Sequence, residues 1–353
     1  RFYDISNSIL GGLLFTMAVG AVFAMPFAGW LSTRFGSKVI TQVGGILSCI
    51  IIPCIVFTPN LAIVSAAFFS LGLCVGATDV AMNGQAVFVE RAYGKAIMSS
   101  FHAVFSVGMA LGAGSGALFA KFEVPLLSHL TLVAIIGGVA CLAAAFYLIN
   151  DTPEEEEKRE KGGSFVLPTK AIIPLGIVAF CCMSGEGAMA DWSAIYLNKV
   201  VGQSEYFSAI GYGVFAIAMT IGRVFGDYFT ERIGKYKLMI YNSMFSVVGL
   251  VILLSFATTG ATLVGLFLVG IGLATIVPIV YSSAGNMNGI DPSIGIAMAT
   301  TIGYTGFFVG PPMIGFLSDA FGLRVGLGFV LILFIAMLLL VIKIYLDKDK
   351  VTK

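Results

Sequence analysis

The sequence is poor in charge: only 11% of its 353 residues are Asp, Glu, Lys or Arg, whereas soluble proteins average about 25%. It has only two histidines and two tryptophans, and its formal net charge is +1. A balance so close to zero gives no electrostatic reason to expect a nucleic-acid partner. Since 58% of the residues are hydrophobic, the composition excludes both a soluble globular protein and a disordered chain. The surroundings of this chain must be mostly hydrocarbon.

Motifs for cofactor or metal chemistry are also missing. The six cysteines lie inside apolar runs without C-x-x-C spacing or a neighbouring histidine, which is typical of packed or lipid-facing thiols. The glycine-rich stretches at 112–116 and 270–272 are embedded in apolar segments, and no P-loop lysine follows either of them. The sequence contains no zinc-ligand set and no nucleophile elbow. We therefore expect no enzyme, no ATP-driven pump, no metal and no cofactor.

Long apolar segments dominate what is present. A bilayer core about 30 Å thick requires roughly 20 apolar residues in a helix, because each backbone polar group must be satisfied within the segment. This criterion predicts an all-α polytopic membrane protein with eleven spans. They cover residues 7–31, 38–57, 60–87, 96–120, 124–150, 168–198, 206–230, 237–257, 260–284, 294–317 and 322–345.

The orientation follows from the distribution of Lys and Arg between loops. Fifteen of them lie in alternate loops and the C-terminal tail, whereas the opposite loops hold only Arg1, Lys121, Lys199 and Arg324. Cytoplasmic loops carry the excess of cations. The sequence therefore predicts that the C-terminus and the charged stretch 151–167 are cytoplasmic and that residue 1 is on the outside.

A repeat divides the sequence into two halves. The segment around Arg34 and Gly36 recurs around Arg232 and Gly234 at a fixed offset in residue number. The same offset pairs glycines in three further places: Gly72 with Gly270, Gly108 with Gly306, and Gly112 with Gly310. We therefore predict an N-terminal bundle at 1–150, a charged cytoplasmic linker at 151–167 and a C-terminal bundle at 168–353.

The offset makes one further prediction. The span 168–198 should have a counterpart of similar length directly before Arg1, so the first half is one helix short. We expect a native protein of twelve helices. A natural eleven-helix protein is the alternative.

The repeated loop resembles the signature of the major facilitator superfamily. That signature reads roughly G-x-L-a-D-R-x-G-R-K, and here the first copy runs from Gly29 through Arg34 and Gly36 to Lys38. Thr33 departs from the acidic position, but the second copy has Glu231 there. The stretches 186–192, 299–304 and 310–312 resemble more narrowly the uncharacterised bacterial YbjJ-like transporters, which are distantly similar to fucose permeases.

This resemblance implies two helix bundles that rock about a site at the membrane midplane, so that access alternates between the two faces. It implies a small-molecule substrate, a bacterial inner membrane as the location, and a monomer. The first and fourth helices of each half line the cavity in such proteins. Here these helices include the spans that carry Asp79, Glu186 and Tyr281. The motif loops, with Gly29, Arg34, Gly36, Lys38 and Gly234, are expected to act as cytoplasmic latches.

Asp79 is the clearest buried acid. A charge at the centre of a membrane helix costs at least about 2.5–3.5 kcal/mol, which makes it a functional candidate. Gly72, Gly76 and Asn83 share its helical face, so this face should meet protein or water rather than lipid. Asp79 and Asn83 either bind a proton or the substrate, or hydrogen-bond neighbouring helices together.

Glu186 and Asp191 share a helix in the second half. Five residues at ~100° each separate them by roughly 140°, so a regular helix cannot aim both at one ligand. Gly185 and Gly187 permit local unwinding, which would relax that limit. We expect Glu186 to be a cavity or proton-coupling group, and Asp191, beside Trp192 near the outer face, to be an outer gate or a structural partner.

Other groups complete the candidate site. Carboxyl groups in a low dielectric bind protons more readily, which makes Asp79 and Glu186 candidate proton carriers. His102 titrates in the physiological range and is either functional or packed. Tyr281 and Tyr304, with Asn286 and Asn288, line an inner cavity or belong to the core.

Arg223 and Asp227 are four residues apart, a spacing that suits an ion pair within one helix. We expect them to form a latch network with Glu231 and Arg232 in the second half. Gly108, Gly112 and Gly116 recur every four residues, which predicts close helix–helix approach.

Three functions remain open at this point. The first is a proton-coupled secondary transporter of a small organic solute. The second is a multidrug exporter, whose apolar cavity requires few polar contacts. The third is a membrane sensor or scaffold that keeps the fold without transporting.

Overall fold

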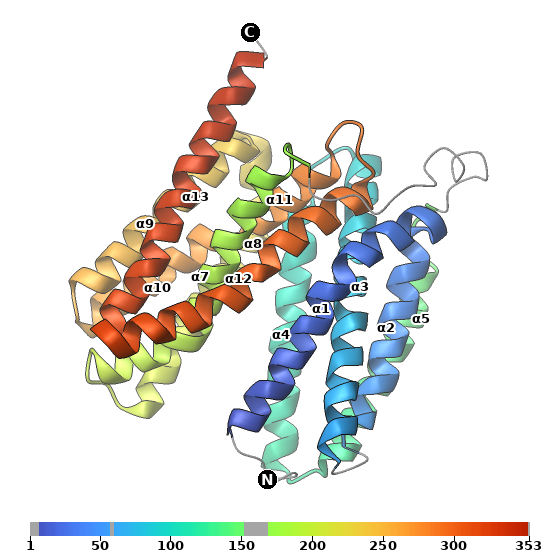
Figure 1. The fold of residues 1–353 in the computed structure, drawn as a ribbon, viewed down its shortest axis with the longest axis horizontal. Helices are drawn as coiled ribbons and strands as arrows, with labels where there is room; N and C mark the ends of the chain where they lie inside the picture. The colour runs from blue at the N-terminus through green and yellow to red at the C-terminus, as the bar shows by residue number, and fades with distance from the viewer. Residues whose placement is uncertain (1–6, 57–59, 152–168, 352–353) are drawn as a thin grey trace. The chain divides into compact units, whose positions relative to one another are not determined.

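The structure is a computed structural model that describes residues 7–56, 60–151 and 169–351, where every regular element is an α-helix (Figure 1). The linker predicted at 151–167 lies outside the described residues except for Asp151. The helices are α1 (Asn7–Phe35), α2 (Ser37–Cys54), α3 (Leu61–Tyr93), α4 (Met98–Lys121), α5 (Leu126–Ala145), α7 (Ile173–Lys199), α8 (Glu205–Ile233), α9 (Lys235–Ser255), α10 (Thr259–Leu273), α11 (Ile276–Gly285), α12 (Pro292–Phe321) and α13 (Leu323–Val351).

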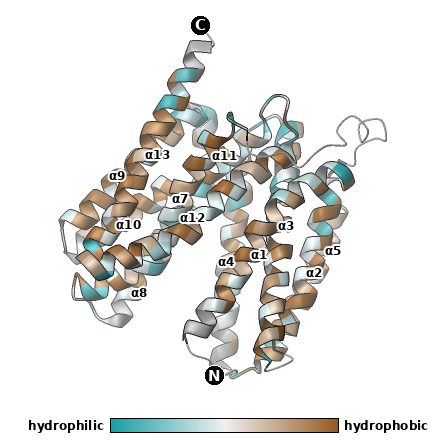
Figure 2. Cartoon of the chain, viewed as in Figure 1, coloured by the Kyte–Doolittle hydropathy of each residue, from teal (hydrophilic) through white to brown (hydrophobic). Residues whose placement is uncertain are grey.

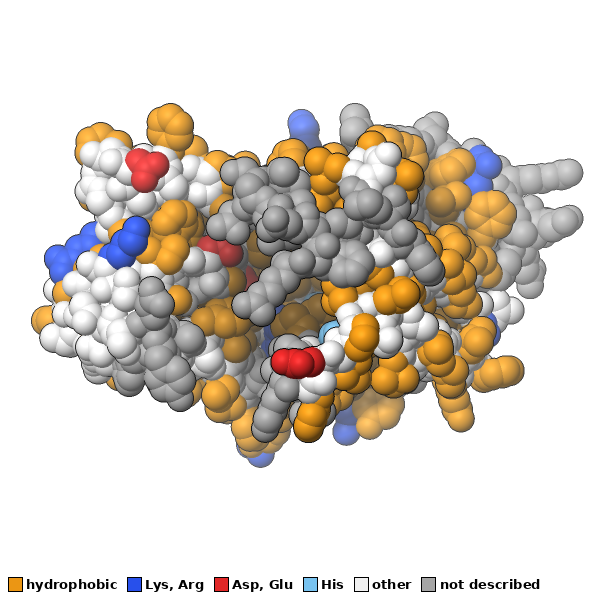
Figure 3. Space-filling view, turned by 90° about the horizontal axis from the view of Figure 1, so that it is seen from below, with side chains coloured by type: hydrophobic (Ala, Val, Ile, Leu, Met, Phe, Trp, Pro, Cys, Tyr) orange, Lys and Arg blue, Asp and Glu red, His pale blue; other side chains and the backbone are white. Residues whose placement is uncertain are grey.

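Each of the eleven predicted spans coincides with a helix, and α10 and α11 together form the ninth. Nine described spans are long and apolar enough to cross a membrane, and the two other predicted ones are α4 and α8. The helices are hydrophobic along most of their length (Figure 2), and large apolar side chains cover much of the outer surface (Figure 3). Such a surface is suited to lipid. The all-helical membrane fold is thereby confirmed.

The sequence repeat recurs in local geometry. Gly36 and Gly234 have nearly identical backbone angles, φ 84° and ψ 146° against φ 83° and ψ 145°, and each begins the next helix. Only glycine adopts this conformation at low cost. The guanidinium of Arg34 stacks over the Trp30 ring at 4.4 Å, and that of Arg232 stacks over the Tyr228 ring at 5.2 Å. All of these pairs are related by the predicted offset.

Helix packing repeats in the same way. A Cβ on Gly72 of α3 would strike the backbone of Met17 in α1, and a Cβ on Gly270 of α10 would strike the backbone of Phe215 in α8. The two glycines are related by the repeat offset, and so are their two partners. The Gly72 and Gly76 face of α3 therefore contacts protein, as predicted. The neighbours α1·α3, α2·α3 and α2·α5 recur as α8·α10, α9·α10 and α9·α13.

The chain forms two compact units. The first comprises Arg1–Tyr93, Gly108–Thr169 and Ala284–Thr301, and the second comprises Gly94–Val107, Lys170–Ser283 and Ile302–Lys353. Each unit therefore includes one segment from the other half of the sequence. Two segments, 94–107 and 284–301, belong to the unit formed mainly by the other half. When the repeat offset is added to 94–107, the range overlaps 284–301, so these two segments are counterparts in the repeat. The division of the halves at the linker stays a prediction.

Two expectations about glycines are wrong. The helix α7 is continuous through Gly185 and Gly187, so no unwinding brings Glu186 and Asp191 onto one face. These glycines instead accommodate the rings of Phe334 and Phe307. In α4, a Cβ on Gly108 or Gly112 would meet nothing within 4 Å, and one on Gly116 would meet only His129 at 3.9 Å. Within the described part of the chain, this glycine stripe is therefore not a surface of close helix contact.

Candidate functional site

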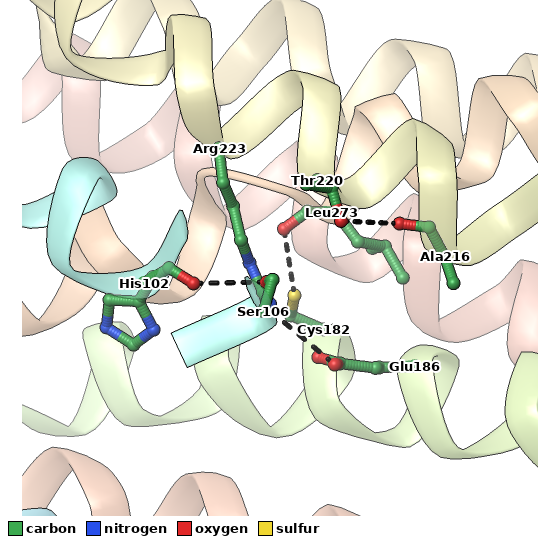
Figure 4. Close-up of polar contacts among 8 residues, drawn as sticks. All are labelled: His102, Ser106, Cys182, Glu186, Ala216, Thr220, Arg223 and Leu273. Atoms are coloured by element: carbon green, nitrogen blue, oxygen red, sulfur yellow. Dashed lines mark hydrogen bonds and ion pairs between the residues drawn. The ribbon is translucent and has the colours of Figure 1, made fainter. Parts of the chain in front are cut away.

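An ion pair between α7 and α8 is the centre of the candidate site, which lies entirely in the second unit. Nη2 of Arg223 lies 3.6 Å from Oε1 of Glu186, with side-chain exposures of 7% and 27% (Figure 4). Arg223 lies about 15 Å along α8 from the end at Ile233, since an α-helix rises 1.5 Å per residue. A buried charge at that depth requires a counter-charge, which Glu186 provides.

The hydroxyl of Ser106, from the first turns of α4, completes this contact. It accepts a hydrogen bond of 2.7 Å from Nη1 of Arg223 and donates one of 3.1 Å to the carbonyl of His102. Nε of Arg223 is buried without a hydrogen-bond partner in the described part of the chain. Because a guanidinium has five N–H donors, the contacts with Ser106 and Glu186 leave Arg223 incompletely satisfied.

His102 and Tyr281 lie beside the ion pair. Their ring centroids are 5.8 Å apart, with the planes tilted by 54°, and Tyr281 is almost completely buried. Nε2 of His102 has no hydrogen-bond partner among the described residues. Figure 4 shows Glu186, Arg223 and Ser106 meeting from α7, α8 and α4, with the His102 carbonyl turned toward Ser106. The predicted residues Glu186, His102 and Tyr281 therefore belong to one cluster.

Asp227 does not form the expected ion pair with Arg223. Its carboxylate instead accepts hydrogen bonds from the backbone N–H groups of Ser99 and Ser100, at 2.9 and 2.7 Å, and from the Ser100 hydroxyl. These amides belong to the first turn of α4, where unpaired donors and the helix dipole favour an anion. Asp227 thus caps α4 from a different helix.

The rest of the expected second-half network is also wrong. Glu231 and Arg232 are exposed, and Arg232 stacks on Tyr228 rather than joining Arg223 or Asp227. Gly234 serves as the backbone junction between α8 and α9.

Asp79 lies in α3, in the first unit, and is half-buried. The side-chain amide of Asn83 donates to the Asp79 carbonyl at 2.8 Å and to its carboxylate at 3.3 Å. The two residues are therefore coupled within α3, and their role in binding a proton or a substrate stays a prediction.

The remaining candidates lie apart from the ion pair. Asp191 is exposed, and the half-buried Trp192 has an indole N–H that is buried without a hydrogen-bond partner in the described part of the chain. The Tyr304 ring packs edge-on against Phe307, with centroids 5.8 Å apart. No described contact joins these residues to Glu186 or Arg223.

Comparison with known proteins identifies the family. The sequence profile of the Major Facilitator Superfamily matches residues 2–289. The chain belongs to this superfamily. It is 35% identical to an uncharacterized MFS-type transporter of Yersinia pestis over 329 residues, which cover 93% of this chain and 85% of that protein.

Two more distant similarities extend this result. The quinolone resistance protein NorA of Staphylococcus aureus is 24% identical over 329 residues, which cover 89% of this chain and 82% of that protein. The crystal structure of the Escherichia coli fucose:proton symporter superposes with a TM-score of 0.80 and 16% identity, over 94% of this chain and 89% of that chain. That likeness supports the fold. This superfamily member is a multi-pass membrane protein and a transporter of small molecules rather than an enzyme.

The first superfamily motif is held by a carboxylate that the sequence did not single out. Asp151, which follows α5, accepts hydrogen bonds from the backbone N–H of Ser37 at 2.8 Å, from the Ser37 hydroxyl, and from the backbone N–H of Lys38 at 3.2 Å. Gln85 of α3 donates to the same carboxylate at 3.2 Å. Lys38 also donates from its ammonium to the Leu148 carbonyl at 3.2 Å. Asp151 therefore caps α2 directly after Gly36.

A second missed contact joins the ends of α3 and α11 in the first unit. Arg91 donates through Nε to the Asn286 side chain and through Nη2 to the Gly285 carbonyl, both at 2.6 Å. Asn286 therefore belongs to this helix-end contact rather than to the expected inner cavity. Gly29 of the motif also packs tightly, since a Cβ there would lie 2.5 Å from Cβ of Ala297 at the start of α12.

Ser106 is the main cluster residue that sequence reasoning missed. A single serine in an apolar helix carries no distinctive signal. One signal was available, however, because Ser106 and Tyr304 are counterparts in the repeat, and Tyr304 was a candidate.

Proposed function

We propose that this protein is a proton-coupled secondary active transporter of a small organic solute that works by alternating access. We place it in a bacterial cytoplasmic membrane with the C-terminus inside, as a monomer of the YbjJ-like branch related to fucose permeases. The relatives from bacteria and the distribution of Lys and Arg support this placement.

The ion pair of Glu186 with Arg223 carries the proposal. When Glu186 binds a proton, Arg223 loses its described counter-charge in a buried environment, which is costly. A conformation that relieves this cost gains population. Proton binding at Glu186 therefore biases the equilibrium between the two access states, which is the requirement for coupling.

Two contacts at the starts of helices are candidates for the conformational change that alternating access requires. The carboxylate of Asp227 binds the first turn of α4, and Gly29 packs on the first turn of α12. Each contact joins helices from different halves of the sequence within a single unit. Alternating access requires such contacts to break and re-form, so we assign them the latch role. Asp79, coupled to Asn83, is the second candidate proton carrier.

A multidrug efflux antiporter is the second candidate function. The similarity to NorA of S. aureus over 89% of this chain favours it. In that case a cationic or apolar drug would compete with the proton at Glu186.

Proton movement in proteoliposomes tests the proposed function. The protein is reconstituted with a pH-sensitive dye inside, and a panel of small organic solutes is added outside. At least one solute should drive a change in internal pH, and Glu186→Gln should abolish it because an amide cannot carry the proton. The matched control is Glu123→Gln, since Glu123 is exposed in the α4–α5 loop. A solute flux that ignores an imposed pH gradient would refute coupling.

A further inference from the structure

We infer that the transported solute carries a carboxylate, and that this carboxylate replaces Glu186 on Arg223 when Glu186 binds its proton. This inference rests on the proposed function and names the chemical class of its substrate. The site that it assigns is the guanidinium of Arg223 with the adjoining Ser106 hydroxyl.

The first observation is that Arg223 has unused donors at the right place. The distance of 3.6 Å between Nη2 and the Glu186 oxygen exceeds that of a direct hydrogen bond. Nε is buried without a hydrogen-bond partner among the described residues. Nε and Nη2 form one edge of the guanidinium fork, which matches the two oxygens of a carboxylate. Glu186 thus leaves this edge incompletely bonded.

The second observation concerns the charges around the pair. The described titratable groups that interact with the pair are Tyr212 of α8, His102 of α4 and Cys182 of α7, and Asp191, farther along α7, acts on Tyr212. Arg223 is the only cation in this set. No other described acid contacts the guanidinium, so protonation of Glu186 leaves Arg223 unpaired.

The net charge of the site before and after loading indicates which charge the solute carries. Before loading, the site holds a guanidinium and a carboxylate, with a net charge of zero. After Glu186 takes up one proton and one monocarboxylate solute binds, the site holds a guanidinium, a neutral carboxyl group and the solute carboxylate, again with a net charge of zero. An uncharged solute would leave a buried cation unpaired, and a cationic solute would add repulsion. One proton therefore accompanies one anion, and the loaded site carries no net charge across the membrane.

Glu186 is the accessible partner of the pair, because its side chain is 27% exposed whereas that of Arg223 is 7% exposed. A group that displaces the glutamate therefore reaches the buried guanidinium from the exposed side. The hydroxyl of Ser106, already 2.7 Å from Nη1, keeps the guanidinium in place during the exchange.

A small-anion rescue experiment tests this exchange without knowledge of the natural solute. In purified Glu186→Gln, the guanidinium lacks its counter-charge, so sodium formate or sodium acetate should raise the midpoint of thermal unfolding by several degrees relative to sodium chloride. The wild-type protein at neutral pH should respond much less. The double variant Glu186→Gln/Arg223→Gln should not respond, and Glu123→Gln should behave as the wild type.

The wild-type protein gives a second reading if Glu186→Gln does not fold. Formate should stabilise it at acidic pH, which favours the protonated form of a carboxyl group, and not at alkaline pH. Equal effects of formate and chloride in both proteins, or a formate effect that survives in the double variant, would overturn the inference.

Transport of matched solutes separates the inference from the proposed function. Glucuronate, glucose and glucosamine share one ring and differ in charge, and lactate, lactamide and 1-amino-2-propanol form a second set. Only carboxylates should drive proton movement, and a potassium diffusion potential with valinomycin should leave the rate unchanged. Proton movement driven by an uncharged or cationic solute would refute the inference but keep the transporter. If no solute moves protons, the proposed function fails, and the formate experiment still decides whether Arg223 binds an anion.

Discussion

At the scale of single residues, Arg223 depends on Ser106. The Ser106 hydroxyl accepts the only hydrogen bond described for this guanidinium, and hydrogen bonds to charged groups contribute about 1.5–3 kcal/mol. Ser106→Ala should therefore lower the free energy of unfolding by about that amount, as measured by reversible denaturation in detergent. It should also weaken formate stabilisation of Glu186→Gln, because the guanidinium loses its orientation.

Ser115→Ala on the same helix is the matched control. Its hydroxyl bonds the Gly112 carbonyl of its own helix, so its effect should stay within about 0.5 kcal/mol. Equal effects of the two variants would mean that Ser106 does not support Arg223.

Arg223 also shows where sequence reasoning reaches its limit. Within one helix, Asp227 is four residues away and is the natural partner by spacing. The contacts that actually form come from α7 and α4, and no periodicity within α8 reveals which residues lie opposite. The shared face of Asp79 and Asn83 was predictable for the converse reason, since both residues lie in one helix and their contact is local.

At the scale of secondary-structure elements, the start of α4 depends on a carboxylate from α8. Asp227→Asn keeps one acceptor oxygen but loses the negative charge that the helix dipole favours. The N–H groups of Ser99 and Ser100 should then exchange with deuterium faster, by a factor that corresponds to about 0.5–2 kcal/mol. Hydrogen exchange with mass spectrometry measures this directly.

The exposed Asp319 in α12 provides the control for that experiment. Asp319→Asn should leave exchange in the first turn of α4 unchanged. Unchanged exchange in Asp227→Asn as well would show that the cap does not stabilise α4.

The junction between α8 and α9 tests the role of the motif glycine. Gly234 has φ 83°, and a Cβ there would meet nothing within 4 Å. Gly234→Ala should therefore lower the free energy of unfolding by about 1–3 kcal/mol through backbone conformation alone. Gly213 lies inside α8 and also faces open space. Gly213→Ala should stabilise the protein by about 0.5–1 kcal/mol, as measured by the thermal unfolding midpoint. A similar effect of both substitutions would contradict this reading.

The elements themselves were predictable, because the length of an apolar helix is fixed by the bilayer. All eleven spans follow from this criterion. The caps did not follow from it, since the carboxylates of Asp151 and Asp227 act on helices that are distant in sequence. An acidic residue at the end of a span gives no indication of which helix start it will meet.

At the scale of the whole molecule, the two halves share the same helix arrangement but differ in one pair of equivalent contacts. Asp227 and Gly29 are counterparts in the repeat, and so are Ser99 and Ala297. In the second unit, the contact is a charge-assisted cap, whereas in the first it is close apolar packing between Gly29 and Ala297. The sequence predicts the shared framework but not this difference in chemistry, which depends on the partner helix. The two contacts should therefore respond to different substitutions.

Gly29→Ala tests the packed contact. Its Cβ would lie 2.5 Å from Cβ of Ala297 and 3.1 Å from the Ser293 carbonyl, and backbone cannot yield as a flexible side chain does. Overpacking of this kind costs typically about 1–3 kcal/mol. The amides in the first turn of α12 should exchange faster, and solute-driven proton movement should slow because the latched state loses population.

Gly12→Ala on the same helix is the matched substitution, since a Cβ there meets nothing within 4 Å. It should leave both hydrogen exchange in α12 and the transport rate unchanged. The charge-assisted contact should remain intact in Gly29→Ala, so exchange at Ser99 and Ser100 should match the wild type. If exchange rises at both helix starts, the two contacts are coupled across the repeat. If it rises at neither, Gly29 is not a point of close packing, and the latch role belongs to Asp227 alone.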